Sequence, residues 1–303
     1  MKAIEVAEIS KSFGKIKALD KVSLTVEEGE LFGLIGPDAA GKSTLFNILV
    51  TLLNPDQGDA TILGLNLMKD YKKLRQMIGY LPGQFSLYGD LSCWENLEFF
   101  ATMYGESIEE NYDLIKPIWE QLQPFKNRKA SALSGGMKQK LALCCALIHK
   151  PKVLFLDEPT TGVDPVSRKE LWEILQKMKS VGITVFVSTS YMDEATICNR
   201  IALIQKGEIL GSAKPQQIID AYQGYLLAIR TDNIYQLLQF LKDYPARNIY
   251  ASGQYVNVVF NDKGEADKMI EVIEKNNIQI RSKEFIQPTI EDCFIQLMRK
   301  KDE

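Results

Sequence analysis

The sequence predicts an α/β fold followed by a smaller α+β unit, and three observations support this. Short apolar segments at residues 30–35, 153–158 and 183–189 have the composition of buried strands. The first of these segments runs into a glycine-rich turn and then into a helix, which is the local order that a phosphate-binding loop requires. After about residue 220 the succession of elements changes, so we expect a second unit there.

The composition limits the class of protein. With 303 residues the chain can form one large or two smaller domains. A net charge of -3 gives no case for a nucleic-acid-binding surface. The five cysteines form no C-x-x-C pair and have no metal-ligand spacing, which suits reduced thiols in the cytosol. No apolar run reaches the ~18 residues of a membrane span and no signal peptide is visible, so we expect any membrane role to come through a partner.

Two strands are expected at the start of the chain, at residues 3–8 and 21–26. Phe13 lies on the turn between them. Its ring has two interpretations: an aromatic side chain folded onto the core, or a platform for an adenine ring.

The strand at 30–35 leads into a segment that fits G-x-x-x-x-G-K-[ST]. Its residues are Gly36, Pro37, Asp38, Ala39, Ala40, Gly41, Lys42, Ser43 and Thr44. A helix behind this loop would direct its N–H groups and the positive end of its dipole at a phosphate. Lys42 would then reach the β- and γ-phosphates, and Ser43 would offer its hydroxyl to Mg²⁺. The alternative is a chance glycine turn before a helix.

Further strand segments are expected at 59–68 and 77–82, with a helix beginning at residue 72 between them. Gln84 follows the second segment, at the strand end where α/β folds collect their ligands. The side chain is either a solvated loop residue or a sensor of the γ-phosphate or Mg²⁺.

Residues 92–129 are expected to be mostly helical, with aromatic side chains that form either core or a docking face. An amphipathic helix is then expected to begin at Ser134, a good N-cap. Its predicted apolar face contains Met137, Leu141, Cys144, Cys145 and Ile148. The turn of Ser134, Gly135 and Gly136 is either a plain helix start or an anion site. His149, at the end of this helix, is expected to complement the helix dipole.

The strand at 153–158 ends in two carboxylates, Asp157 and Glu158. A strand of a parallel sheet is buried on both faces and is mostly apolar, so we expect both carboxylates at its C-terminal end. There Asp157 can hold Mg²⁺ through water, and Glu158 can orient an attacking water. Because Pro159 and a threonine follow, a helix N-cap is the structural alternative.

The remaining elements complete the α/β part and then form the second unit. A helix is expected at 166–180, and the strand at 183–189 ends at Ser190. A short helix at 192–198 and a hairpin of 201–204 and 207–210 follow. In the second unit, strands are expected at 225–231, 255–261 and 278–285, and helices at 233–244, 264–276 and 288–299.

Together these motifs resemble the nucleotide-binding ATPase subunit of ABC transporters, over residues 3 to about 218. The matching motifs are the P-loop at 36–44, the Q-loop at Gln84, the signature at 133–137, the Walker B strand at 153–157 with Glu158, the D-loop at 162–164 and an A-loop aromatic at Phe13. The resemblance implies a P-loop NTPase fold with a mixed sheet core, an antiparallel β subdomain and a helical subdomain at about 90–150. The expected domains are an ATPase domain at 1–218 and a small C-terminal α+β accessory domain at 220–303.

The resemblance also implies the ligands, ATP and Mg²⁺. The residues that it places at the metal are Ser43, Gln84 and Asp157, and those at the catalytic centre are Glu158, Gln84 and Ser190. Two ATPase subunits would close head to tail, as a homodimer or a heterodimer. Ser134, Gly135 and Gly136 would then complete the ATP site of the partner subunit.

An integral-membrane permease is the other partner that the resemblance implies. The chain would be cytoplasmic and peripheral on the inner face of the cell membrane, and no nucleic acid is expected. Residues 288–294 are similar to the tail of the ABC-2 type branch, which exports drugs or polysaccharides.

Two positions depart from the family pattern. Ser190 stands where the family usually has a histidine that contacts the γ-phosphate and the catalytic glutamate, and a serine has no ring to span that gap. Ala39 stands where glycine is common, beside Asp38 where asparagine is usual, and it costs on the order of 1 kcal/mol if the backbone there needs φ > 0. The departures suggest half of an asymmetric heterodimer, whose own site binds ATP but hydrolyses it slowly.

Two other functions are compatible with the motifs. ABC-type ATPases also act on ribosomes or nucleic acid without a transporter, usually with two ATPase units in one chain or with basic insertions. A mainly regulatory subunit that binds ATP with little catalysis is the second alternative. The single ATPase unit and the acidic balance favour the transporter subunit.

Overall fold

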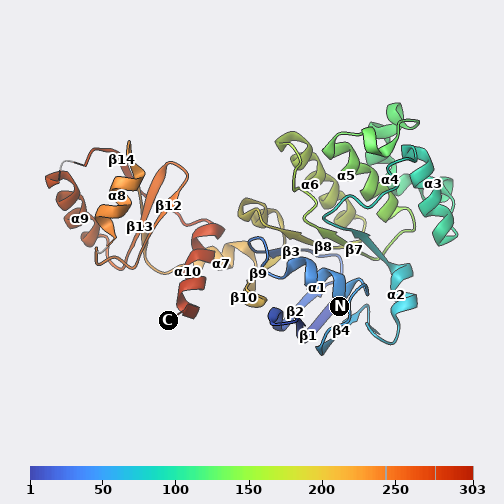
Figure 1. Cartoon of the computed structure of the whole chain (residues 1–303), viewed down its shortest axis with the longest axis horizontal. Helices are drawn as coiled ribbons and strands as arrows, with labels where there is room; N and C mark the ends of the chain where they lie inside the picture. The colour runs from blue at the N-terminus through green and yellow to red at the C-terminus, as the bar shows by residue number, and fades with distance from the viewer. Residues whose placement is uncertain (243, 277, 303) are drawn as a thin grey trace. The chain divides into compact units, whose positions relative to one another are not determined.

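The computed structural model describes residues 1–242, 244–276 and 278–302 (Figure 1). The chain divides into two compact units, Met1–Pro215 and a second that begins at Gln216. Each unit has a hydrophobic core of its own.

A six-stranded sheet forms the centre of the first unit, in the order β10-β9-β3-β8-β7-β6. The strands are β3 (Leu31–Ile35), β6 (Ile78–Leu81), β7 (Val153–Asp157), β8 (Thr184–Thr189), β9 (Arg200–Gln205) and β10 (Glu208–Ala213). All neighbours pair in parallel except β9 and β10, which form a hairpin. The buried strands expected from the sequence are confirmed, and the carboxyl ends of β3, β8, β7 and β6 meet at one edge.

A second, antiparallel sheet has the order β2-β1-β4-β5. Its strands are β1 (Lys2–Phe13), β2 (Ile16–Glu27), β4 (Gln57–Ile62) and β5 (Leu65–Asn66). The first two are longer than expected and pair as far as Phe13 and Ile16, with several shifts of register along the way. Each shift interrupts the alternation of apolar and polar residues, which is why the pattern detected only part of each strand.

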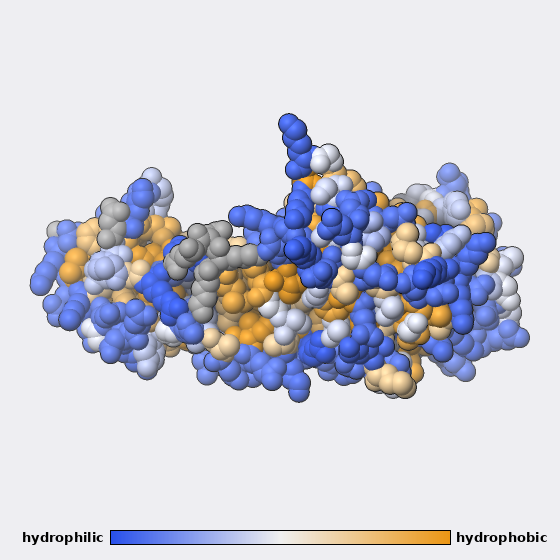
Figure 2. Space-filling model, turned by 90° about the horizontal axis from the view of Figure 1, so that it is seen from below, coloured by the Kyte–Doolittle hydropathy of each residue, from blue (hydrophilic) through white to orange (hydrophobic). Residues whose placement is uncertain are grey.

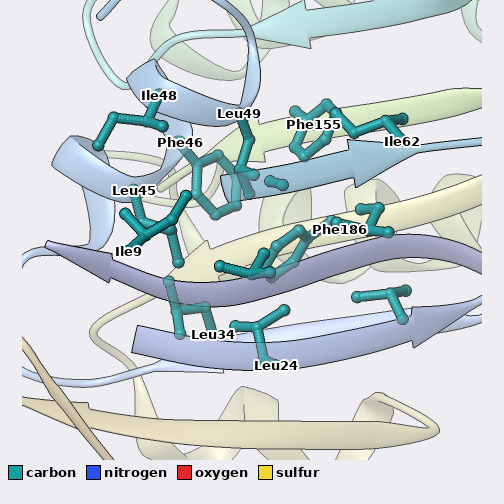
Figure 3. Close-up of a cluster of buried hydrophobic side chains, with 14 of the residues drawn as sticks. Ile9, Leu24, Leu34, Leu45, Phe46, Ile48, Leu49, Ile62, Phe155 and Phe186 are labelled. Carbon is teal, nitrogen blue, oxygen red and sulfur yellow. The ribbon is translucent and has the colours of Figure 1, made fainter. Parts of the chain in front are cut away.

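Helix α1 (Lys42–Leu49) packs between these sheets (Figure 3). The ring of Phe46 lies 5.8 Å from that of Phe155 on β7 and 4.9 Å from that of Phe186 on β8. Ile9 and Leu24 belong to the same buried cluster from the antiparallel sheet. On the other face of the central sheet, α6 (Pro165–Ser180) packs against β3 and β8 (Figure 1). The start of α1 is therefore held rigidly at the edge where the strands end.

The helical region expected from the sequence is confirmed. Its elements are α3 (Cys93–Tyr104), α4 (Ile108–Leu122), the 3₁₀ turns η1 (Gln123–Phe125) and η2 (Ala130–Ala132), and α5 (Gly135–Leu147). The separate helix expected to begin at residue 72 is α2 (Tyr71–Met77). Ser92 and Glu95 form a capping box at the start of α3. Ser134 is the N-cap of α5, as predicted, and accepts a hydrogen bond from the N–H of Met137 at 3.4 Å.

Helix α5 differs from the expected amphipathic helix. Leu143, Ala146 and Leu147 lie off the predicted apolar face, yet they are as buried as Leu141 and Cys144 on it. The helix contacts α3, α4, α6 and β6, so its second half has no solvent-exposed face. The one-sided pattern was therefore wrong for this half of α5, because a helix covered on all sides needs no polar face.

The expectation that His149 complements the dipole of α5 is also wrong. Its ring is buried, stacks on Tyr104 with centroids 3.8 Å apart, and places Nε2 2.9 Å from the carbonyl oxygen of Ile78. Burial lowers the pKa of His149, which disfavours the cation that a dipole interaction requires.

The second unit is a four-stranded antiparallel sheet in the order β12-β13-β11-β14. Its elements are α7 (Pro215–Asp220), β11 (Tyr225–Thr231), α8 (Ile234–Leu241), β12 (Asn248–Ser252), β13 (Tyr255–Phe260), α9 (Gly264–Lys275), β14 (Ile280–Ile286) and α10 (Ile290–Asp302). Side chains of α8 and α9 form the core with β11 and β13. The sequence did not predict α7 or β12, and residue 243 of the helix expected at 233–244 lies outside the described residues.

One buried carboxylate ties α10 to the sheet of the second unit. Asp292 Oδ2 accepts hydrogen bonds from the backbone N–H and the hydroxyl of Thr289, at 2.7 and 2.8 Å, and so caps the helix start. Its Oδ1 accepts from the hydroxyl of Tyr250 at 2.5 Å and from Asn257 at 3.4 Å. Burial and this hydrogen bond raise the pKa of Tyr250, so the phenol stays the donor. The segment 288–294 thus joins α10 to β12 and β13.

In the part of the chain that the structure describes, no helix combines the length and the apolar character needed to cross a membrane. Figure 2 shows one face of the surface, where hydrophilic side chains predominate and apolar ones gather in patches between them.

Titration of His149 is expected to make stability depend on pH. Because burial lowers its pKa in the folded chain, the unfolded chain binds more protons below the ordinary histidine value of ~6.5. The free energy of unfolding should therefore fall as the pH drops from ~6.5 toward the lowered pKa. Urea titrations at a series of pH values will measure the slope of the free energy of unfolding against pH. His149→Phe keeps a ring against Tyr104 and removes the only histidine, so its slope should be flatter; equal slopes for both proteins would contradict the argument.

Candidate nucleotide-binding site

Four adjacent strands of the central sheet deliver the predicted site residues to one edge. The P-loop follows β3, Ser190 follows β8, Asp157 ends β7 with Glu158 next, and Gln84 lies just past β6. A cleft of about 900 Å³ opens there. Its lining includes Phe13, Asp38, Ala39, Ala40, Gly41, Lys42, Ser43, Thr44, Gln84, Asp157 and Glu158. The lining does not include the predicted site residues Gly36, Pro37, Ser190, Ser134, Gly135 and Gly136.

The two P-loop glycines are required by close approach of other backbone. A Cβ on Gly36 would lie 2.2 Å from the carbonyl oxygen of Ile204 on β9. Gly41 has φ +106°, and a Cβ there would lie 2.6 Å from the carbonyl oxygen of Ala18 on β2. The loop is thus wedged between two sheets and turns directly into α1, whose first N–H groups have no partner within the helix. Such a set of N–H groups is suited to an anion.

Ala39 has φ +60°, the left-handed conformation that its position was suspected to require. A residue with a Cβ pays roughly 1–2 kcal/mol for this conformation. This strain is confined to Ala39. The next residue of the loop, Ala40, is buried and has no positive φ.

Lys42 is buried and already has three oxygen partners. Its Nζ donates to the carbonyl oxygens of Gly36 and Pro37, at 2.7 and 2.8 Å. The same Nζ lies 2.8 Å from Glu158 Oε1. The P-loop cation and the carboxylate after β7 therefore form an ion pair across the cleft. A phosphate that binds Lys42 must compete with Glu158 for its ammonium group.

The two carboxylates after β7 have different environments. Asp157 is buried, and its Oδ1 accepts a hydrogen bond of 2.6 Å from the hydroxyl of Ser188. The same hydroxyl accepts from the N–H of Glu158 at 3.0 Å. Glu158 is half-buried with φ +51°, and its Oε2 accepts from the hydroxyls of Thr161 at 2.8 Å and Ser190 at 3.3 Å. Ser190 thus contacts the carboxylate, although it lacks the length of a histidine ring.

Sequence reasoning missed Ser188, Thr161, Tyr80 and Asn47. The hydroxyl of Tyr80 donates to Asn47 Oδ1 at 3.3 Å, and both residues line the cleft. Burial, and then the charge of Asp157, raise the pKa of Tyr80, so its phenol remains neutral beside the carboxylate. The sequence could have indicated these residues only by their position. Each lies at or near the end of a strand or helix that carries a predicted site residue.

The oxygen atoms of Ser43, Gln84 and Asp157 are a hydroxyl, an amide and a carboxylate. Among the described residues, no group of three or more His, Cys, Asp or Glu side chains could hold a metal. A single carboxylate with two neutral oxygens suits Mg²⁺, which takes its remaining oxygens from phosphates and water. The residues present therefore fit Mg²⁺ that arrives with a nucleotide.

The turn at the start of α5 lies elsewhere on the surface. Ser134 and Gly135 are exposed. A Cβ on Gly136 would lie 2.7 Å from the hydroxyl oxygen of Ser167 on α6, and one on Gly135 would lie 3.2 Å from the carbonyl oxygen of Gly162. The glycines thus allow this turn to pack against the start of α6 and the segment before it, while Ser134 and Gly135 stay exposed.

Comparison with known proteins places these motifs in context. The family model described as ABC transporter matches residues 19–161. The probable multidrug ABC transporter ATP-binding protein YbhF of Escherichia coli (strain K12) is 43% identical over 217 residues, 71% of this chain but only 38% of that protein. The Nod factor export ATP-binding protein I of Sinorhizobium fredii is 33% identical over 304 residues, 97% of this chain and 85% of that protein.

The similar solved structures are also ATP-binding subunits or cassettes of this kind. One described as the ATP binding subunit of an ABC transporter covers 72% of this chain and 92% of its own, with a TM-score of 0.66 and 28% identity. A dimeric ATP-binding cassette in a post-hydrolysis state, bound to ADP and Pi, covers 70% of this chain and 98% of its own, with a TM-score of 0.63 and 29% identity.

The strain at Ala39 can be measured directly. Ala39→Gly should raise the free energy of unfolding by about 0.5–1 kcal/mol, because relief of the left-handed strain outweighs the added backbone entropy of glycine. Ala40→Gly is the matched control and should lower it, since that residue is buried and has no such strain. Urea denaturation of the three proteins will measure both changes. Equal destabilisation by the two substitutions would show that the strain is absent.

Proposed function

The chain belongs to the ATP-binding proteins of ABC transporters, a family of ATPases, and we propose that it powers an export complex by binding and hydrolysing ATP. The observation that carries the proposal is the convergence of Lys42, Asp157, Glu158 and Gln84 in one cleft, from the ends of adjacent strands. The similarity to proteins named for multidrug and Nod factor export supports export as the direction.

We propose a role for each of these side chains. The N–H groups at the start of α1 and Lys42 bind the β- and γ-phosphates, with Ser43, Gln84 and Asp157 at the Mg²⁺. When bound, Mg²⁺ neutralises charge on the phosphate oxygens. Phe13 is half exposed at the cleft, which favours its role as an adenine platform over a ring folded onto the core.

Glu158 is the proposed residue that orients the attacking water. Once the γ-phosphate takes up Lys42, the Oε1 of Glu158 loses its ion pair and becomes available to accept a hydrogen bond from water. Thr161 and Ser190 still hold its Oε2 from the other side. Lys42 meanwhile stabilises the charge that develops on the transferred phosphoryl group.

The exposed residues Ser134 and Gly135, at the N-terminus of α5, support the proposed head-to-tail dimer. They lie outside this chain's own cleft, so an anion that binds them comes from elsewhere, and the ATP on a second ATPase subunit is the proposed one. The N-cap geometry of Ser134 and the close packing of Gly136 on Ser167 keep this donor set in place.

Ser190 is the basis for proposing an asymmetric heterodimer. Its hydroxyl contacts Glu158 at 3.3 Å but has neither the reach nor the cationic form of a histidine. We propose that the site on this chain hydrolyses ATP slowly, while its Ser134 turn completes a faster site on the partner subunit.

The proposed permease contact is the surface between the Q-loop and the helical region. A hollow of about 310 Å³ is lined there by Leu52, Pro82, Phe100 and Tyr104, and Pro82 also lines the nucleotide cleft. Several exposed apolar side chains line this hollow or are next in sequence to residues that line it. They are Leu52, Phe85, Tyr88, Phe99 and Met103. Exposed apolar patches mark partner sites, and we place the chain on the cytoplasmic face of the membrane through this contact.

The catalytic assignment predicts opposite effects of two substitutions on steady-state ATP hydrolysis by the purified chain. Glu158→Gln should lower the rate by about 10²–10⁴-fold, because the amide does not take a proton from water. Ser190→His should raise the rate, since a ring can reach both Glu158 and the γ-phosphate. Ser180→His, at an exposed serine on α6, is the control and should leave the rate unchanged. Fast hydrolysis that Glu158→Gln leaves intact would remove both the role of Glu158 and the proposed asymmetry.

The proposed permease contact predicts that association of the chain with membranes depends on Phe99. Phe99 is 41% exposed and its ring packs 4.9 Å from that of Tyr88. Phe99→Glu should reduce the fraction of tagged chain that sediments with membranes from cells that express the whole complex. Tyr235→Glu changes an exposed aromatic residue of the second unit and serves as the control. Cofractionation of the unaltered chain with ribosomes instead would favour the non-transport alternative.

A further inference from the structure

Glu194 is a buried carboxylate that none of the predicted site motifs includes. It lies on η3 (Met192–Ile197), after the strand that carries Ser190, and only 2% of its surface is exposed. An ionised carboxylate is costly to bury unless it has several partners, so its contacts indicate what it is for.

One oxygen of Glu194 joins the ends of two neighbouring strands. Its Oε2 accepts from the hydroxyl of Thr160 at 3.0 Å and from the hydroxyl of Thr189 at 2.5 Å. Thr160 lies two residues after Glu158, and Thr189 directly precedes Ser190. The hydroxyl oxygen of Thr189 also accepts from the N–H of Tyr191 at 3.0 Å, which fixes the other side of Ser190.

The second oxygen reaches helix α6. Glu194 Oε1 lies 3.6 Å from Nε of Arg168, and the guanidinium of Arg168 lies 3.9 Å from the centre of the Tyr191 ring. Arg168 is four residues after Asp164, the N-cap of α6. A single carboxylate therefore contacts the turn after β7, the end of β8 and the start of α6.

We propose that Glu194 is a positioning residue for ATP hydrolysis, which fixes Glu158 relative to Ser190 without touching the nucleotide. The inference rests on the proposed function. Glu158 sits at φ +51°, an unfavourable conformation that persists only where its surroundings hold it. The 3.3 Å contact from Ser190 to Glu158 joins two different loops, so its length depends on how those loops are held together. Glu194 supplies that connection on the buried side of both loops.

A purely stabilising role accounts for this arrangement less well. The contact with Arg168 is longer than a hydrogen bond, and buried ion pairs of this kind are often replaced by apolar residues without loss of stability. What an apolar side chain does not provide is an acceptor for the two threonine hydroxyls at once.

The test compares Glu194→Gln with Glu30→Gln in the full chain. Glu30 is a matched control, because it is also buried, lies 3.5 Å from Nε of Arg200, and accepts from the N–H of Glu27 at 2.8 Å. It precedes β3, at the opposite edge of the sheet from the cleft. Glutamine keeps one acceptor oxygen, so its NH₂ group must face either the guanidinium of Arg168, which repels it, or the two threonine hydroxyls, which then lose their acceptor. Glu194→Gln should therefore lower kcat by about 10–100-fold, with KM for ATP unchanged to within about twofold. Glu30→Gln should leave kcat within about twofold.

Substitutions of the partner residue add a rescue. Thr160→Ser keeps the hydroxyl donor to Glu194 and should retain the kcat of the unaltered chain. Thr160→Val removes the donor and should lower kcat in the direction of Glu194→Gln. Equal effects of Ser and Val at position 160, or equal effects of Glu194→Gln and Glu30→Gln on kcat, would overturn the proposal.

Hydrogen–deuterium exchange gives a readout that does not need turnover. Glu194→Gln should speed exchange in peptides that contain residues 158–161 and 189–191, and Glu30→Gln should not. An unaltered chain that neither binds nor hydrolyses ATP contradicts the proposed function, whereas exchange that Glu194→Gln leaves unchanged contradicts the positioning role.

Discussion

Parallel hydrogen bonding between β3, β8, β7 and β6 is the constraint on which the candidate site depends. It brings residues from distant parts of the sequence to a single edge, because parallel strands end on the same side. The aromatic contacts of Phe46 with Phe155 and Phe186 then hold α1 against the sheet beneath the P-loop. Neither the P-loop nor the acidic strand end would form a cleft without this alignment.

Sequence reasoning was most successful where one residue type is physically required. Gly36 and Gly41 have no space for a Cβ, and the acids after β7 belong at a strand end, so motif and structure agree. It failed where tertiary contacts decide. The second half of helix α5 is covered on all sides and has no polar face, and His149 was expected to be charged but is stacked and buried. Strand β12 is short and partly polar, so its pairing with β13 left no pattern in the sequence.

The same limit applies within the site. Ser188 and Glu194 occupy ordinary positions in a strand and a short helix, and their partners become neighbours only after folding. The positive φ of Ala39 and of Glu158 shows that strain lies on both sides of the cleft. Positions of this kind are typical of functional sites, where the surrounding structure holds an unfavourable backbone in place.

The ion pair between Lys42 and Glu158 has a consequence for the release of products. The chain's own carboxylate is the counter-ion of the lysine, so under the proposed function phosphate binding would exchange one anion for another. The exchange also runs in reverse. Under the proposed function, Glu158 would compete with the departing phosphate for the same ammonium group after hydrolysis, and its return to Lys42 would favour release of the product.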